Sequence, residues 1–207
     1  MDLRPEDLTA AAGAAVSALR PVVGADWTVK AGDLDWSCVQ TIDHIVGALL
    51  RYATNLSTRT TSRRRSPRPS ELDATPEELV SSLESAAAIL TQVAIAAPPS
   101  ARGFHPLGMA DTSGFIAMGC DETLVHGYDI ATGLGIAFRP PAELANKVVR
   151  RLFPWAPDGF NGWDTLLWAN GRLALPRHPR LDGSEWGWQC APLAEWNGAM
   201  KRWSSLG

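Results

Sequence analysis

Apolar residues recur at helical spacing through most of the segment 1–135. Three stretches of similar length, about residues 5–19, 75–97 and 113–132, show this spacing, and no convincing alternating strand lies between them. A fourth, over residues 37–55, has the clearest apolar stripe, made of Val39, Ile42, Val46, Leu49, Leu50 and Ala53. The pattern predicts an all-α core built as a four-helix bundle.

Start and stop signals support these helix boundaries. The sequence Thr75-Pro76-Glu77-Glu78 combines a capping threonine, a proline at the first helical position and a glutamate three residues after the threonine. Pro98-Pro99 ends that helix, and Gly133 closes the last helix of the four. The segment 103–108 between them is predicted as a loop.

The composition of the chain and its predicted secondary structure change after the bundle. An additional helix is predicted over residues 141–152 and a further one over 163–173, whereas 176–196 is broken by prolines and predicted to be irregular. We therefore divide the chain into a bundle, 1–135, and a Trp-rich extension, 136–207, that packs on it. The extension holds seven of the nine tryptophans. They are expected to anchor it to the bundle, or to wall a pocket for an apolar substrate.

Composition excludes several classes of protein. A net charge of −3 argues against a nucleic-acid binder, and the longest weakly polar stretch, residues 86–99, is too short to span a membrane. The three cysteines are far apart in the sequence and their number is odd, so no disulfide framework is expected. A protein without disulfides is expected in the reducing cytoplasm. Residues 57–73 contain five arginines, which indicate a solvated loop, with a nucleic-acid patch as the alternative.

The candidate chemistry lies on two of the predicted helices. Glu122 and His126 are four residues apart, so both side chains lie on one helix face and could reach the same ion. His44 lies nearly opposite the apolar stripe of its own helix. If the two faces meet, these residues form a two-histidine, one-carboxylate site for zinc or a similar divalent metal, with one position open. The alternative is a helix-surface pair and an unrelated surface histidine.

Two further residues are candidates for supporting roles. Asp129 shares the face of His126 and could accept a hydrogen bond from its imidazole, or be a surface acid. Arg51 shares the face of His44 and is a candidate for steering an anionic group, with a surface arginine as the alternative. The other two histidines, His105 and His178, are predicted to be loop residues. Nucleotide-binding glycine motifs and the serine-hydrolase elbow are absent from the sequence.

Two segments carry a family resemblance. The segment from Trp36 to His44, WSCVQTIDH, resembles the W-x-V-x-x-L-x-x-H-L segment of the DinB-like superfamily, and Glu122 to Asp129, ETLVHGYD, resembles an E-x-x-x-H-x-x-D segment. Together they are similar to the N-terminal domain of mycothiol-dependent maleylpyruvate isomerases. The resemblance covers roughly residues 5–135. It implies a four-helix bundle that holds zinc at His44, Glu122 and His126, with Trp36 packed in the bundle.

The resemblance also implies a reaction. Mycothiol, the low-molecular-weight thiol of actinobacteria, would act as co-substrate, and its thiolate would attack a small electrophile to give S-transfer or isomerisation. The second domain that usually follows in this family does not fit in the Trp-rich extension, which argues against maleylpyruvate itself as substrate. The alternatives are a DinB-like metal-dependent hydrolase and a non-catalytic metal-binding module.

Overall fold

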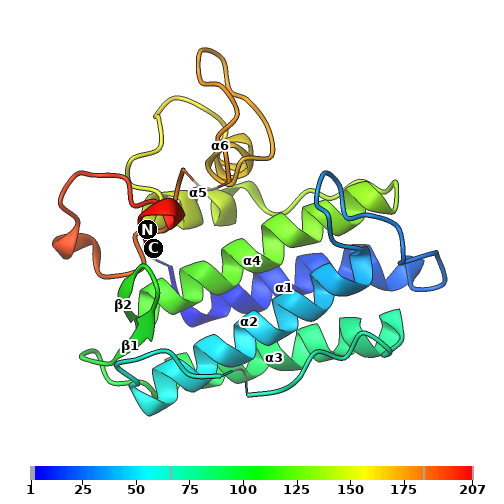
Figure 1. Cartoon of the computed structure of the whole chain (residues 1–207), viewed down its shortest axis with the longest axis horizontal. Helices are drawn as coiled ribbons and strands as arrows, with labels where there is room; N and C mark the ends of the chain where they lie inside the picture. Colours follow the sequence, from blue (N-terminus) through cyan, green and yellow to red (C-terminus); the bar gives the residue numbers. More distant parts are fainter. Residues whose placement is uncertain (1–2, 66, 184, 207) are drawn as a thin grey trace.

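Four long helices lie side by side in the computed structural model, which describes residues 3–65, 67–183 and 185–206. Contacts run in the order α1, α3, α2, α4 around the bundle, so α2 and α4 are neighbours. The chain is thus mostly helical, as predicted. The four helices are α1 (Pro5–Leu19), α2 (Cys38–Thr58), α3 (Pro76–Ala96) and α4 (Thr112–Gly133) (Figure 1).

Capping residues fix where the bundle helices begin. Thr75 accepts a hydrogen bond from the backbone N–H of Glu78, and the Glu78 carboxylate accepts one from the backbone N–H of Thr75 at 2.8 Å. Ser37 and Gln40 form the same reciprocal pair at the start of α2. Each box satisfies backbone donors that have no partner inside the helix. The second box sets the register of the helix that carries His44.

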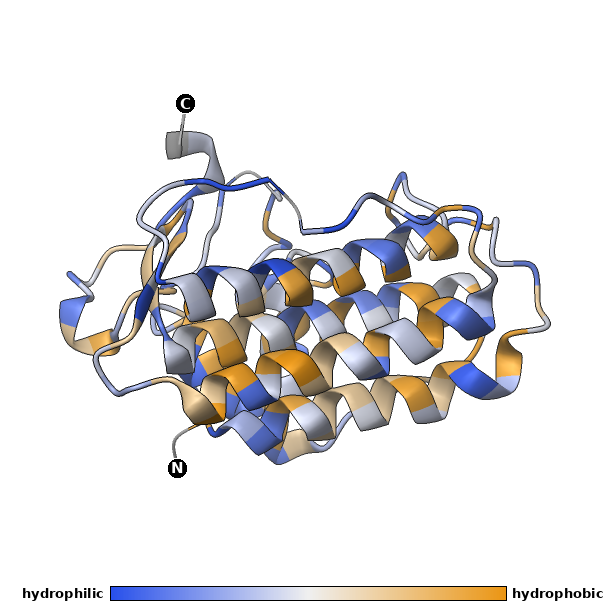
Figure 2. Cartoon of the chain, turned by 90° about the horizontal axis from the view of Figure 1, so that it is seen from below, coloured by the Kyte–Doolittle hydropathy of each residue, from blue (hydrophilic) through white to orange (hydrophobic). Residues whose placement is uncertain are grey.

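The helix α3 is long and apolar enough to cross a membrane by length and composition. The apolar stretch read from the sequence begins only at Ala86, which is why no membrane-spanning length was expected. In the fold, the buried side chains of α3 pack against α1 and α2. Apolar and polar residues alternate along the surfaces of the bundle helices (Figure 2). A core helix passes the same test as a membrane span, so the expectation of no membrane contact stays a prediction.

A two-stranded antiparallel hairpin replaces the predicted loop at 103–108. It consists of β1 (Arg102–His105) and β2 (Gly108–Asp111) and leads directly into α4. The strands have four residues each, too few for an alternating pattern to be recognised. Gly103 is needed where β1 crosses the end of α2, since a Cβ there would lie 2.6 Å from the backbone oxygen of Asn55.

The extension contains two helices, α5 (Ala142–Leu152) and α6 (Gly162–Ala169), which pack on each other. The first confirms the predicted helix over 141–152. The second is shorter than the predicted 163–173 because Asn170 leaves the helix and Gly171 has a φ of +69°. The other described residues of the extension are irregular apart from an isolated β-bridge between Leu175 and His178 and short 3₁₀ turns at Leu193–Glu195 and Trp203–Leu206. A division at residue 135 stays a prediction.

A buried arginine ties the extension to the bundle. Arg151, on α5, is 7% exposed and donates to the backbone oxygens of Gln189, at 2.7 Å, and Cys190, at 3.2 Å. Its guanidinium also donates to the Asp111 carboxylate, which caps α4, and to the Ser113 hydroxyl. One side chain therefore joins α5, the start of α4 and the irregular tail.

The helix α4 is buried on nearly all sides. The sequence analysis gave it one apolar and one polar face, but α1 and α2 cover one side, and α5, α6 and the tail cover the other. Gly114 shows how close the tail comes, because a Cβ there would lie 2.1 Å from the backbone oxygen of Cys190. The acidic residues of α4, Asp121, Glu122 and Asp129, thus lie inside the protein, where a buried charge requires a partner.

Candidate metal centre

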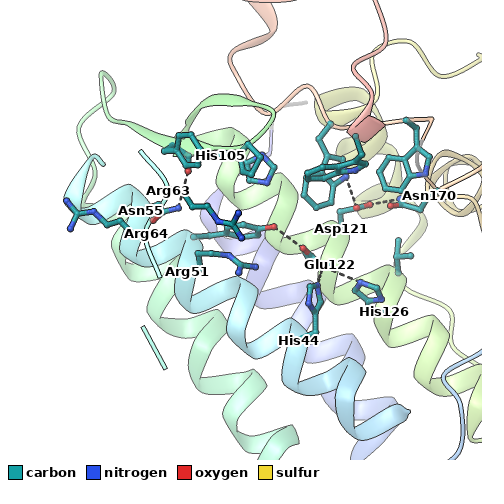
Figure 3. A pocket seen from close by; sticks show the side chains of 18 of the residues that line it. His44, Arg51, Asn55, Arg63, Arg64, His105, Asp121, Glu122, His126 and Asn170 are labelled. Atoms are coloured by element: carbon teal, nitrogen blue, oxygen red, sulfur yellow. Dashed lines mark hydrogen bonds and ion pairs between the residues drawn. The ribbon is translucent and has the colours of Figure 1, made fainter. Parts of the chain in front are cut away.

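Three side chains from α2 and α4 meet beside the core. His44 Nε2 lies 3.1 Å from Glu122 Oε2, and His126 Nε2 lies 3.4 Å from the same oxygen (Figure 3). The ligand atoms of the three residues all lie within 4.8 Å of one another, so the group could hold a metal ion. Two imidazole nitrogens and one carboxylate oxygen are donors that zinc accepts, and three protein ligands leave a fourth position open. The residues present therefore fit the metal that the sequence implies.

A hydrogen-bonded chain fixes the orientation of His126. Its Nδ1 lies 3.0 Å from Asp129 Oδ2, and Arg172 donates to both carboxylate oxygens of Asp129, at 3.1 and 2.6 Å. Asp129 is 3% exposed, so the structure places it in a supporting position rather than on the surface. Carboxylate partners of this kind hold a ligating imidazole in one tautomer. Arg172 lies in the extension and was not found from the sequence, where no spacing connects it to residue 129.

The carboxylate of Glu122 is held by groups on both sides. Tyr52 donates from its hydroxyl to Oε1 at 2.8 Å, while the two histidines face Oε2. Burial alone would raise the pKa of Glu122, but His44 and His126 outweigh it and hold that pKa well below its usual range. Glu122 is therefore the negative centre of the group. Tyr52 was also missed, because it belongs neither to the apolar stripe of its helix nor to the residues assigned to the His44 face.

Trp36 lies over the two histidines instead of inside the bundle. Its ring centroid is 4.9 Å from that of His44 and 6.4 Å from that of His126. With 42% of its surface exposed, it is not a core residue, which corrects the expectation that it packs the bundle. It shields one side of the histidine pair, while Glu122 faces a cavity on the other.

The cavity next to the three residues has a volume of about 880 Å³. The bundle supplies the metal-ligand side, the hairpin supplies Phe104 and His105, and the extension supplies Trp186, Trp188 and Trp203. The two roles expected of the tryptophans coincide in Trp186 and Trp188, which are buried and also line the cavity. Arg51, the other sequence candidate, lines the same cavity.

His105 is a buried wall of the cavity and not a simple loop residue. It is 6% exposed and packs against Tyr52, Trp188 and Trp203. Burial lowers the pKa of His105 to about 4, so the ring is neutral at pH 7. Because its Nδ1 accepts the backbone N–H of Leu107 at 3.2 Å, the proton lies on Nε2.

The neutral state of His105 predicts a pH dependence of stability. In the unfolded chain a histidine has a pKa near 6.5, so between pH 6.5 and 4 the unfolded state binds a proton that the folded state does not. The contribution of this residue to the free energy of unfolding is therefore fully present above pH 6.5 and is lost as the pH decreases toward 4. Between pH 7 and 4 the wild type is expected to lose roughly 3 kcal/mol more unfolding free energy than His105→Gln. Urea unfolding series of both proteins measure this, and equal losses would contradict it.

Asp121 is a second buried acid beside the site. It is 1% exposed and accepts hydrogen bonds from Asn170, at 2.8 Å, and from the indole N–H of Trp188, at 3.0 Å. Burial raises the pKa of Asp121 to about 7. Both donors belong to the extension, so the residue next to Glu122 connects the metal-ligand side of the cavity to its aromatic wall.

The three cysteines have no part in the site. Cys38, Cys120 and Cys190 are free and buried, and burial raises the pKa of each thiol, to about 11 for the first and last. Raised pKa values leave little thiolate at neutral pH, so these residues are inert.

Comparison with known proteins gives one family match. The model of the mycothiol maleylpyruvate isomerase N-terminal domain matches residues 8–131, which span α1 to α4 and include all three candidate ligands. Searches of curated proteins and of solved structures found no match. The resemblance noted in the sequence is thus confirmed over more than half of the chain. The chain belongs to the mycothiol maleylpyruvate isomerase N-terminal domain family, part of the DinB-like superfamily.

Proposed function

We propose that the protein is a zinc-dependent enzyme that uses a low-molecular-weight thiol, mycothiol, for S-transfer to a small electrophile or for its isomerisation. The observation that carries this proposal is the position of His44, Glu122 and His126, whose ligand atoms face a cavity of about 880 Å³. A structural zinc site is closed by four protein ligands, whereas a catalytic one keeps a position for water or substrate. Family membership supports mycothiol as the thiol.

The protein's own residues divide the work in this reaction. Bound zinc would lower the pKa of a thiol at the open position. Asp129 keeps the proton of His126 on Nδ1, so that Nε2 stays free as a ligand atom, and Tyr52 orients Glu122. The aromatic wall of the cavity offers apolar surface to the substrate. In S-transfer the thiol loses its proton, and its sulfur forms a bond to an electrophilic carbon, which either releases a leaving group or takes up a proton at the neighbouring atom.

The cavity also bears on the alternatives. A metal-binding module without catalytic activity does not need an open space beside its metal. Here the tail tryptophans line such a space without filling it, which favours an enzyme. A hydrolase would use the same three ligands with water in place of the thiol. The enzyme is proposed to act in the cytoplasm on small molecules, with the thiol and the electrophile as its partners, and without nucleic acid or membrane.

The test is thiol conjugation with and without metal. Zinc-loaded and chelator-treated protein are incubated with mycothiol and monobromobimane, a neutral electrophile, and the conjugate is measured by fluorescence after chromatography. We expect conjugation above the uncatalysed rate only with zinc, and a loss of at least about tenfold in Glu122→Gln. Glu143→Gln, an exposed glutamate on α5, is the matched control and should behave like the wild type.

Three outcomes distinguish the alternatives. Zinc-dependent release of bromide with hydroxyl in place of the thiol would assign the protein to the hydrolases. Conjugation that does not depend on zinc would remove the metal from the mechanism. A rate equal to the uncatalysed rate at every metal content would overturn the proposed transfer.

A further inference from the structure

One side of the cavity is formed by arginines for which the described part of the chain supplies no ion-pair partner. Arg51, Arg63, Arg64 and Arg65 line it, and none of them has a carboxylate oxygen within 4.0 Å among the residues that the structure describes. The other cavity arginine, Arg172, is by contrast fully paired with Asp129. The acids that line the cavity are engaged elsewhere, because Glu122 faces the two histidines and Asp121 accepts from Asn170 and Trp188.

The three consecutive arginines lie in a segment that is fastened to the fold. We call residues 60–65 the arginine segment. It starts after Arg59, whose φ of +49° turns the chain out of α2. The backbone oxygen of Thr60 accepts from the N–H of Phe104 at 2.7 Å, and the Thr60 hydroxyl accepts from Arg64 Nε at 2.9 Å.

A second attachment lies just beyond the segment. Arg68 Nη2 lies 2.5 Å from Asp43 Oδ1, and the backbone N–H of Glu71 donates to the same oxygen at 3.1 Å. Asp43 is 6% exposed and belongs to α2, next to His44. Residues 61–65 are exposed and lie outside helices and strands, as expected for a solvated loop. The attachments on both sides hold the arginines of this loop beside the cavity.

The opposite side of the cavity offers flat aromatic surfaces. The ring centroids of Trp186 and Trp188 are 6.3 Å apart, and those of Trp188 and Trp203 are 5.7 Å apart. Figure 3 shows Arg51, Arg63 and Arg64 on one side of Glu122. Asp121, which accepts a hydrogen bond from Trp188 of this aromatic wall, lies on the other side together with Asn170. A ligand that spans the cavity would therefore pass over the candidate metal ligands.

We infer that Arg51 and the arginine segment form a subsite for the anionic group of a substrate whose flat apolar body lies against Trp186, Trp188 and Trp203. Guanidinium groups bind carboxylate or phosphate oxygens through charge-assisted hydrogen bonds, and aromatic walls bury a flat apolar body. The inference rests on the proposed function and names the chemical class of its electrophile, which is an anionic aromatic or conjugated molecule.

Calorimetric titration of the full chain tests the subsite. The probes are 3-phenylpropanoate, phenyl phosphate and the neutral 3-phenylpropanamide, each titrated into zinc-loaded and metal-free protein. We expect at least one anion to bind about tenfold or more tightly than the amide in both forms. The triple variant R63Q/R64Q/R65Q should lose this preference. Its matched control, R139Q/R150Q/R177Q, removes the same charge from arginines that do not line the cavity, and should keep it.

The outcomes that overturn the inference are specific. Equal affinity for amide and anions in the wild type would exclude the subsite, and a preference that disappears without zinc would assign the anion to the metal. A preference retained in R63Q/R64Q/R65Q would remove the arginine segment from it. A dT12 oligonucleotide that binds through these arginines, with no discrimination among the phenyl probes, would assign them to nucleic acid. The bimane conjugation assay uses a neutral electrophile that does not need the anion subsite. Its result therefore tests the proposed function independently of the result of the titrations.

Discussion

The His126→Ala variant is expected to purify without zinc. His126 supplies one of only three candidate ligand atoms, and its Nε2 lies 3.4 Å from the Glu122 oxygen that faces both histidines. Loss of a partner that merely orients a ligand already costs about 10- to 100-fold in metal affinity. Removal of the ligand itself should therefore cost more than about 100-fold. Because Asp129 would keep Arg172 as its partner, the fold should survive the change.

Elemental analysis of the purified protein and competition with a chromophoric chelator measure this effect. The wild type is expected to contain about one zinc per chain. His178→Ala is the matched control, since His178 is the one histidine that does not line the cavity, and this variant should retain its zinc. A His126→Ala protein that still binds one zinc with wild-type affinity would contradict the proposed centre.

Arg151→Met is expected to be the most destabilising of the substitutions considered. The wild-type guanidinium is buried and donates to Asp111, Ser113 and the backbone oxygens of Gln189 and Cys190. Methionine fills a similar volume but removes the donor of two carbonyl oxygens and leaves the Asp111 carboxylate with only its capping hydrogen bond from Gly114. Breaking a buried ion pair by removing one partner costs about 3–5 kcal/mol. We expect a loss of that size in the free energy of unfolding.

Urea unfolding followed by tryptophan fluorescence measures this loss. Arg150→Met on the same helix is the control, because Arg150 is exposed and its replacement should cost less than about 1 kcal/mol. Limited proteolysis adds a local measurement, since the chain around residues 189–190 should be cut sooner in Arg151→Met than in the control. Equal stability of the two variants would show that the tail is held by its tryptophans alone.

The helices and the metal-ligand set could be predicted because local rules decide them. Capping boxes and apolar spacing set the ends of α2 and α3, and the i, i+4 spacing of Glu122 and His126 depends only on helix geometry. His44 required one assumption, that its face meets that of α4. The contact between α2 and α4 satisfies it.

The remaining parts of the site depend on contacts between distant segments. Arg172 meets Asp129 across 43 positions, and Trp188 meets Asp121 across 67. No periodicity within one helix contains such pairings. The same reason explains the error on α4, because a polar residue that pairs with a distant partner looks like a surface residue in its own helix. His105 was underestimated for this reason too, as its burial comes from tryptophans of the extension.

The match to the family ends at residue 131, but the cavity does not. Its metal-ligand side belongs to the shared bundle, whereas Asn170, Arg172 and the aromatic wall come from the chain beyond it. The extension could therefore differ among proteins that share this bundle, with a different wall facing the same candidate metal ligands. Such proteins would have the bundle in common and would differ in the shape of molecule that their cavities accept.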